Sequence, residues 1–526
     1  MSVLCAALAA VALGCAAFAL RARRFAVADL ALTAWVLGCA AGHSGVAMAL
    51  APNAQRAARP DAEWWVDASA TDSGNGSSSR PWRALADALA RVRGRTWIHL
   101  AAGIYRGPIE LGSEVRMIGA PGAVLAVDAA PAVLRTSAPL ELESLDVRGG
   151  EIGVDASADL RLSGVRFSGQ RQAAICQRGG GLEAHRLNVV GSGTDEVGIR
   201  IEPGSSARIA DSVFRGGLRI GVEIAGAARL DLRASRFEGP SIAVRSRQAA
   251  VQVASSSASG GSEPAFAFVG GSAVMREVRV LGHEYGVLAS AGCVLDVSGF
   301  TSFRARRAGI ALVSSKGVLS EIVVLESGGY GGVQSVNGDL RLQDFRIDRA
   351  RSYGILLHDG TAQVRDGVVS KVADPDSGGA GDGIHVRLGR VSVASVTIRQ
   401  TDGAGVLAAQ MAQVVLRDLQ LDGNRWGGLV ADTGAHVEAS SILIRRSDAA
   451  AIAIPGGAVV KVDLLHSTHN ARGVVWTDCP AGAEVLLSRV RSGNEEERAS
   501  RCVGRWQAPH LFDPLCESHV EDGSAR

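Results

Sequence analysis

One short phrase, a glycine followed by alternating apolar residues, recurs through most of this 526-residue chain. Clear copies are Gly198-Ile199-Arg200-Ile201, Gly354-Ile355-Leu356-Leu357 and Gly383-Ile384-His385-Val386. The copies, in which alanine sometimes replaces glycine, begin at positions 153, 174, 198, 221, 243, 265, 286, 309, 332, 354, 383, 405, 428, 451 and 473. Their spacing is 21 to 24 residues, apart from one step of 29 residues between 354 and 383. Fifteen copies at this short period predict a solenoid.

Each repeat contains three short segments in which apolar and polar residues alternate, as in β-strands with one buried side. The repeat that begins at Gly383 continues with such segments at 390–393 and 396–399, followed by a polar turn. Glycine, asparagine, aspartate and serine between the segments are typical of tight turns. Leucine-rich repeats would instead have fixed leucines and a helical half-unit. We therefore expect an all-β fold, a parallel β-helix with about 15 or more coils of ~22 residues.

Composition agrees with narrow coils and tight corners, since the chain has 65 glycines and only 4% aromatic residues. The net charge is +2, and acidic and basic residues are interleaved. Without a basic stripe, no binding to nucleic acid is expected. We expect the solenoid to be monomeric.

The N-terminal residues predict attachment to a membrane. Residues 2–20 are uncharged and apolar, and a second apolar run covers 25–51. Both runs are long enough to span a bilayer. The arginines at 21–24 between them should stay in the cytoplasm, which puts the rest of the chain on the periplasmic or extracellular side.

Other interpretations of this region also export the chain. Translation from about Leu20 would make the arginines the start of a cleaved signal, with Ala47-Met48-Ala49 as cleavage site. Alternatively, Val36-Leu37-Gly38-Cys39 is a lipoprotein box and Cys39 is lipidated. A third possibility is that the cysteines here are only small apolar residues of membrane segments.

The predicted organisation has five parts. These are a membrane anchor or signal region (1–51), a linker (52–61), an N-terminal cap with the first coil (62–115), the parallel β-helix (116–485) and a C-terminal tail or cap (486–526). Near and within the tail lie Cys479, Cys502 and Cys516, two of which could form a disulfide in an oxidising compartment. The spacing does not determine the pair.

The entrance to the coils has its own pattern. Pro81 after a run of serines predicts a short capping helix over 81–92, and a strand is expected over 97–100. The phrase Ala102-Gly103-Ile104-Tyr105-Arg106 follows. This entrance resembles right-handed parallel β-helix proteins of the pectin lyase-like superfamily, in which a short helix covers the first coil and a similar phrase begins the winding. The resemblance covers about residues 62–485 and implies right-handed coils.

Many enzymes of that superfamily act on polysaccharides, but their motifs are missing here. The Gln-Asp-Thr phrase of pectin methylesterases and the Gly-Asp-Asp and Gly-His-Gly phrases of polygalacturonases do not occur. The Asp-Pro-His of mannuronan epimerases has only Asp374-Pro375-Asp376 as a counterpart. We therefore expect a carbohydrate-binding or structural protein of the cell envelope. A polysaccharide lyase, epimerase or hydrolase, and an envelope scaffold that docks proteins, are the alternatives.

The 29-residue step marks the candidate site, because an insertion in a solenoid forms a loop over one face, often the binding face. Alternation places His358 and His385 on the outside of neighbouring coils. Together with Asp382 they are the candidates for acid–base chemistry.

Aromatic rings stack on sugars, while carboxylates and arginine bind hydroxyl and acid groups. The candidates for substrate binding are Asp374, Asp376, Asp402, Arg387, Tyr330, Tyr353 and Trp426. The alternative is that the aromatic residues pack on adjacent turns and the aspartates only form turns. No cofactor is required, but Ca²⁺ is possible, for instance at Asp67, Asp72 and Asn75.

An outward column near these residues is unusually apolar. It comprises Leu288, Ala311, Leu356, His385, Leu407, Val430, Ala453 and Val475. Either the C-terminal tail covers it, which we favour, or it docks a partner.

Overall fold

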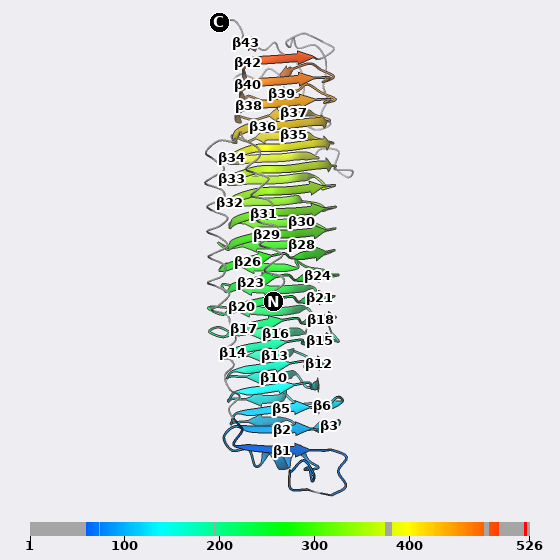
Figure 1. Cartoon of the computed structure of the whole chain (residues 1–526). Coiled ribbons are helices and arrows are strands. Elements are labelled where there is room, and N and C mark those ends of the chain that lie inside the picture. The colour runs from blue at the N-terminus through cyan, green and yellow to red at the C-terminus, as the bar shows by residue number, and fades with distance from the viewer. Residues whose placement is uncertain are drawn as a thin grey trace, which may run out of the picture. The chain divides into compact units, whose positions relative to one another are not determined.

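The structure is a computed structural model that describes residues 59–72, 74–193, 196–373, 381–477, 483–493 and 520–522. Pro60–Arg526 is one compact unit. Its described residues wind into about 17 turns of a parallel β-solenoid with almost no helix. Figure 1 shows the strands stacked from β1 (Ala62–Val66) to β42 (Glu484–Gly493). The parallel β-helix expected from the repeat is thus confirmed. The right-handed winding stays a prediction, in line with the right-handed connections of nearly all parallel strands.

Each coil contributes to three parallel sheets, which we call face 1, face 2 and face 3 in chain order. Face 1 also contains β2 (Thr96–Leu100), β5 (Val115–Gly119), β8 (Leu140–Glu143), β11 (Leu160–Ser163), β14 (Gly181–His185), β17 (Ser206–Ala210), β20 (Arg229–Arg233), β23 (Ala250–Ala254) and β26 (Ser272–Arg276). Face 2 begins with β3 (Gly103–Arg106), β6 (Ala123–Val127), β9 (Asp146–Gly149), β12 (Arg166–Ser168), β15 (Asn188–Gly191), β18 (Val213–Gly216), β21 (Arg236–Glu238), β24 (Ser257–Ser259) and β27 (Arg279–Leu281).

Face 3 carries the repeated glycines. Its separate strands are β4 (Ile109–Leu111), β7 (Ala132–Thr136), β10 (Ile152–Ala156), β13 (Ala173–Gln177), β16 (Val197–Ile201), β19 (Ile220–Ala225), β22 (Ile242–Arg247), β25 (Phe266–Val269), β28 (Tyr285–Ser290), β30 (Ala308–Val313), β35 (Ala404–Ala409), β37 (Gly427–Ala431), β39 (Ile452–Ile454) and β41 (Val475–Thr477). Each strand pairs in parallel with the same face of the coils before and after it, as β13 does with β10 and β16.

Strands merge across corners in the later coils. Faces 1 and 2 are continuous in β29 (Val294–Phe303), β31 (Lys316–Leu325), β36 (Gln413–Asn424), β38 (His436–Arg445), β40 (Val459–Thr468) and β42. All three faces are continuous in β32 (Gly331–Asp348), β33 (Tyr353–Val372) and β34 (Asp382–Thr401). The short β43 (Val520–Asp522) pairs with β42 and so extends the sheet at its last edge.

The repeated glycine lies where backbones of adjacent coils come closest. A Cβ atom at Gly354 would lie 2.4 Å from the carbonyl oxygen of Gly383 in the next coil and 2.4 Å from a methyl carbon of Val369. At Gly198 and Gly286 the carbonyl of the next coil would also lie 2.4 Å away. At these glycines a side chain would meet the backbone of the next coil, which explains why glycine, with alanine as the smallest substitute, recurs at this period.

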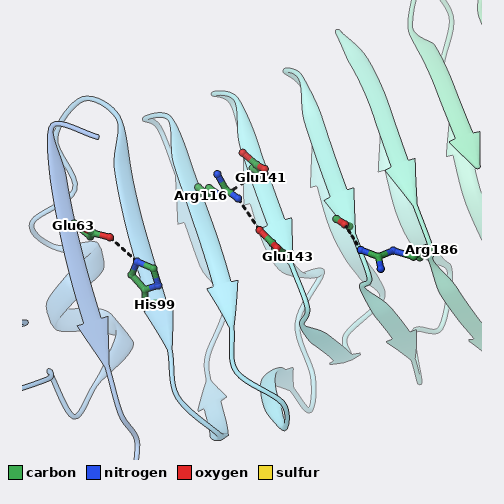
Figure 2. A network of polar contacts seen from close by, with 7 residues as sticks. Glu63, His99, Arg116, Glu141, Glu143 and Arg186 are labelled. Atoms are coloured by element: carbon green, nitrogen blue, oxygen red, sulfur yellow. Dashed lines mark hydrogen bonds and ion pairs between the residues drawn. The ribbon is translucent and has the colours of Figure 1, made fainter. Parts of the chain in front are cut away.

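Outward charges on face 1 are paired between neighbouring coils. Figure 2 shows Glu63 of β1 beside His99 of β2, with 2.8 Å between carboxylate and Nε2. Arg116 of β5 lies 3.5 Å from Glu141 and 2.7 Å from Glu143, both on β8. Because adjacent strands are about 4.8 Å apart, opposite charges that are in register, or two residues out of register, neutralise one another between neighbouring coils.

The capping helix is shorter than predicted. Only α3 (Leu85–Leu89) forms, with Leu85 and Ala88 buried. The prediction of a helix from Pro81 was wrong because the backbone N–H of Trp82 donates to the carbonyl of Trp65, 2.8 Å away. This bond holds the preceding segment as a bridge to β1. No helix in the described residues is long and apolar enough to span a membrane, and residues 1–58, including Cys39, lie outside them.

Replacing an anchor glycine by alanine should destabilise the solenoid because the added methyl group meets backbone. We expect Gly354→Ala to lower the free energy of unfolding by about 1–3 kcal/mol. Gly112→Ala is the matched control, since a Cβ atom there meets nothing within 4 Å, and should change stability by no more than about 0.5 kcal/mol. Chemical denaturation of both variants checks this, and equal effects would contradict the close-approach explanation.

Candidate functional site

The candidate site lies on face 3 where β34 begins. The chain leaves β33 at the corner between faces 2 and 3 and returns at Gly381, directly before Asp382. The residues in between, 374–380, lie outside the described part, so the structure does not place Asp374 and Asp376. The site can therefore be built only from the two strands and the coil above them.

Asp382 and His385 point to the same side of β34, although strict alternation would separate residues three positions apart. The register pairs Tyr353 with Asp382 and Ile355 with Ile384, and skips the two glycines between them. Ile384 enters the core, while Asp382 and His385 lie together on the other side of the strand, where they contact each other.

The two side chains form a buried hydrogen-bonded pair. Nδ1 of His385 lies 2.7 Å from Oδ2 of Asp382, and the residues are only 4% and 1% exposed. The other carboxylate oxygen, Oδ1, accepts the backbone N–H of Ala404 in the next coil at 2.8 Å. Asp382 therefore connects the imidazole to the backbone of β35.

Arg387 determines the proton arrangement on His385. Its Nε lies 2.6 Å from Nε2 of the imidazole. An arginine can only donate and a carboxylate can only accept, so Nε2 is unprotonated and Nδ1 carries the proton. His385 is thus a neutral bridge between the Asp382 carboxylate and the Arg387 guanidinium.

The guanidinium of Arg387 keeps donors free. The residue is partly exposed. Among the described residues, its bond to His385 is its sole hydrogen bond, and no carboxylate lies within ion-pair distance of it. Its two terminal amino groups therefore have no partner among the described residues, and they form a fork that suits a carboxylate, sulfate or phosphate.

Apolar and aromatic side chains surround the pair. The Tyr353 ring meets the His385 imidazole edge-on, with centroids 4.9 Å apart and planes at 78°. Leu356 is the register neighbour of His385 one coil below, and Leu407 is the neighbour one coil above. These contacts exclude water from His385 and leave Arg387 as its exposed end.

The structure places the other candidates at different distances from this pair. His358 is the register neighbour of Arg387, not of His385. Asp402 lies exposed at the corner beside Gly381, where a Cβ atom on that glycine would be 3.0 Å from its Cβ.

Two of the aromatic candidates flank the pair. Tyr330 is 44% exposed and lies at the corner that precedes β32, with Arg307 over its ring at 5.8 Å. Trp426 precedes β37, and its backbone N–H donates to the carbonyl of Gly403. Since β32 and β37 are each two coils from β34, the rings lie roughly 10 Å to either side along the stack.

The apolar outward column is confirmed with two changes. Gln334 belongs to it, because it pairs with Ala311 and Leu356. Its last member is Trp476, not Val475, since Trp476 pairs with Ala453 whereas Val475 pairs with the core residue Ile452. Trp476 and Leu407 pack on the cluster of Ala404, Val430 and Ala453. The tail beyond Gly493, apart from β43, lies outside the described residues.

In the earlier coils of face 3, several arginines form ion pairs with carboxylates of neighbouring coils. Glu223 lies between Arg200 at 3.5 Å and Arg245, whose short contact with it is an ion pair. Burial alone would raise the pKa of Glu223, but the hydrogen bond and charge of Arg245 outweigh it and lower that pKa. Asp155 is placed in the same way between Arg135 and Arg178.

The residues considered for calcium cap their own turns. Asp67 accepts the N–H and hydroxyl of Ser69 at 2.8 and 2.6 Å, which lowers its pKa. Asn75 accepts the same two groups of Ser77. No group of three or more potential metal ligands occurs within the described residues.

A separate hollow of about 540 Å³ lies on face 2, with Glu321, Phe345 and Asp366 in its lining.

A comparison with models of protein families finds no match, and a comparison with curated sequences finds none either. Solved structures are similar at low identity. The catalytic unit of a GH87 α-1,3-glucanase from Streptomyces thermodiastaticus has 11% identity and a TM-score of 0.24, over 78% of this chain and 65% of the glucanase. The periplasmic alginate epimerase AlgG has 10% identity and a TM-score of 0.21, over 78% of this chain and 83% of the epimerase.

A pectate lyase is also similar, with 12% identity and a TM-score of 0.13, over 75% of this chain and 80% of the lyase. The parallel solenoid that the resemblance to the pectin lyase-like superfamily implied is present in this chain. That fold rests on the strand register of this chain, and nothing about function follows from these similarities.

Sequence reasoning found Asp382, His385 and Arg387 but not their connection. A general base beside an acid was expected, whereas the structure shows a neutral histidine between an acid and an arginine. The recurrent anchor glycine is the feature that could have revealed it, because the register skips that position, so that strict alternation does not hold across it.

Removing the Asp382 carboxylate should leave two buried donors without acceptors, the N–H of Ala404 and Nδ1–H of His385. We expect Asp382→Ala to lower the free energy of unfolding by about 2 kcal/mol or more. Asp402→Ala, which removes an exposed carboxylate from the adjacent corner, should change it by less than about 0.5 kcal/mol. Thermal and chemical unfolding measure the stability of both variants. An unchanged free energy of unfolding in Asp382→Ala would show that the pair is not formed.

Proposed function

We propose that this chain binds an acidic polysaccharide on face 3, with Arg387 contacting an acid group of the glycan. The observation that carries the proposal is the buried Asp382–His385 pair, which holds Arg387 by its Nε and leaves both terminal amino groups without a partner among the described residues. Such an arrangement fixes the direction of the guanidinium before a ligand arrives, so that less conformational entropy is lost on binding.

Several side chains at the corner before Asp382, five residues ahead of Arg387 along β34, suit a sugar chain. Tyr330 and Trp426 lie at corners on either side of the site, and together they cover four coil spacings, about 19 Å along the stack. Aromatic rings offer sugars an apolar surface, and the exposed Asp402 carboxylate can accept hydroxyl groups. An extended oligosaccharide along this corner would meet these groups in one line.

A second candidate function is proton transfer on such a glycan. Arg387 would neutralise a uronate carboxylate, and its departure from Nε2 would free His385 to accept the proton α to that group. Asp382 would stabilise the resulting imidazolium through Nδ1–H. The occupied Nε2 and the 4% exposure of His385 favour binding over this activity in the arrangement described.

We also propose that residues 1–51 export the chain and hold it at the membrane, with the solenoid on the periplasmic or extracellular side. The two apolar runs and the arginines between them support this. In fractionated cells the chain should sediment with membranes, and protease added from outside the inner membrane should digest the solenoid. Recovery in the soluble cytoplasmic fraction would contradict this part.

Arg387 should determine affinity for acidic glycans. We expect the purified full-length chain to bind acidic and not neutral polysaccharides in calorimetric titrations, with affinity that falls as salt rises. Arg387→Ala should weaken binding roughly tenfold or more. Arg387→Lys should recover little of it, because lysine lacks the planar fork and the Nε–H that bonds His385.

The matched control is Arg399→Ala, which removes an exposed arginine from face 2 of the same strand. Its affinity should equal that of the wild type. Ultraviolet absorbance of unsaturated sugars, followed in the same samples, distinguishes lyase activity from binding alone. Equal binding by the wild type and Arg387→Ala would contradict the proposed site.

A further inference from the structure

The structure points to a particular class of acidic glycan, and this inference rests on the proposed binding at Arg387. We infer that face 3 selects a polysaccharide whose acid groups are sparse, each separated from the next by neutral and less polar sugars. A polyuronate with an acid group on every sugar would be a poorer ligand. The inference follows from how charge is distributed along this face.

In the earlier coils of face 3, the charges in the column that later contains His385 neutralise one another. Between β7 and β22 its strands carry Arg135, Asp155, Arg200, Glu223 and Arg245 on the outward side, and neighbouring charges are paired at 2.5 to 3.5 Å. Every one of these arginines has a carboxylate partner on face 3. These charges, all in the column that His385 occupies in a later coil, are therefore neutralised, whereas Arg247 at the end of β22 is exposed and has no ion-pair partner among the described residues.

In its later coils, face 3 is nearly uncharged. From β28 to β41 the parts of the strands that lie on face 3 (331–336, 353–358 and 382–387 in the three continuous strands) contain one arginine, Arg387, no lysine, and one carboxylate, Asp382. The register neighbours of Arg387 are His358 below and Ala409 above, neither of which is an acid. Arg387 is thus the single arginine or lysine on the face 3 strands of this stretch, and it has no carboxylate partner among the described residues.

The neighbouring surface is suited to neutral sugars. The outward column beside Arg387 continues as Leu356 below and as Leu407, Val430 and Trp476 above. The repeat of an extended sugar chain is of the same order as the coil spacing of about 4.8 Å. A polyuronate along the stack would therefore bring its next acid groups against leucine and valine, and removing a charge from water without a partner is costly.

Glycans that meet this description carry carboxylates, or sulfate or phosphate groups, at intervals, with methylated, acetylated, deoxy or simple neutral sugars between them. Arg387 would bind the acid group in a bidentate manner. The apolar column would contact the less polar sugars. A single ion pair also implies that affinity depends only weakly on salt.

The test compares polymers that differ in charge density. The full-length chain is titrated with polygalacturonate, with the same polymer after methyl esterification of most carboxyl groups, and with neutral dextran. Alginate and hyaluronan, which carry an acid on every sugar and on every second sugar, form a second matched pair. We expect the sparser member of each pair to bind roughly tenfold tighter, and Arg387→Ala to abolish this preference.

Ala409→Asp supplies the missing partner. It places a carboxylate one coil above Arg387, in the register that Arg200 and Glu223 use, and should reduce binding of the sparse polymer roughly tenfold. Ala409→Asn, of equal size and without charge, should leave binding intact. Thermal unfolding of both variants confirms that they fold.

The outcomes separate this inference from the function it rests on. Binding that strengthens with every added acid group, and that still requires Arg387, would overturn the inference and leave the proposed function standing. Binding by none of the polymers, or binding unaffected by Arg387→Ala, would overturn both. A preference for sparse polymers that Arg387→Ala abolishes and Ala409→Asp reduces would establish both.

Discussion

The close approach of backbones at the start of face 3 is the constraint on which the rest of this structure depends. At Gly354 and its counterparts, the carbonyl oxygen of the next coil occupies the space of a Cβ atom. This contact holds adjacent coils in the same register through the stack, so that side chains of like position form columns. Once columns exist, each outward residue has a neighbour about 4.8 Å above and below it, and the chemistry of the surface is decided by pairs along these columns.

The same constraint also shapes the candidate site. Asp382 contacts His385 across Gly383, and the parallel register places the N–H of Ala404 where it binds the same carboxylate. A chain of three side chains then extends from the buried edge of β34 to a partly exposed guanidinium. Neutral histidine as the middle member transmits orientation without adding a charge, while Asp382 balances the charge of Arg387. The site is thus an oriented cation on an otherwise apolar surface.

Much of this could be predicted from the sequence because a solenoid repeats its local rules. The period, the three strands per coil and the outward positions of His358 and His385 all follow from alternation and spacing. The error at Val475 arose because Val474, and not Gly473, occupies the anchor position of the last coil, as the pairing of Ile452 with Val475 shows. The helix from Pro81 was overpredicted because a backbone bond between Trp82 and Trp65 competes with it. The bond between Arg387 and His385 could not be predicted, since it depends on side-chain directions that alternation alone leaves open.

A structure of the protein with an acidic oligosaccharide would test this account most directly. The account predicts an acid group of the sugar within hydrogen-bonding distance of the terminal amino groups of Arg387, with sugars along the corner between Tyr330 and Trp426. His385 should remain bonded to Asp382 through Nδ1. Sugar bound instead in the hollow on face 2 beside Phe345, with Arg387 still facing solvent, would contradict it.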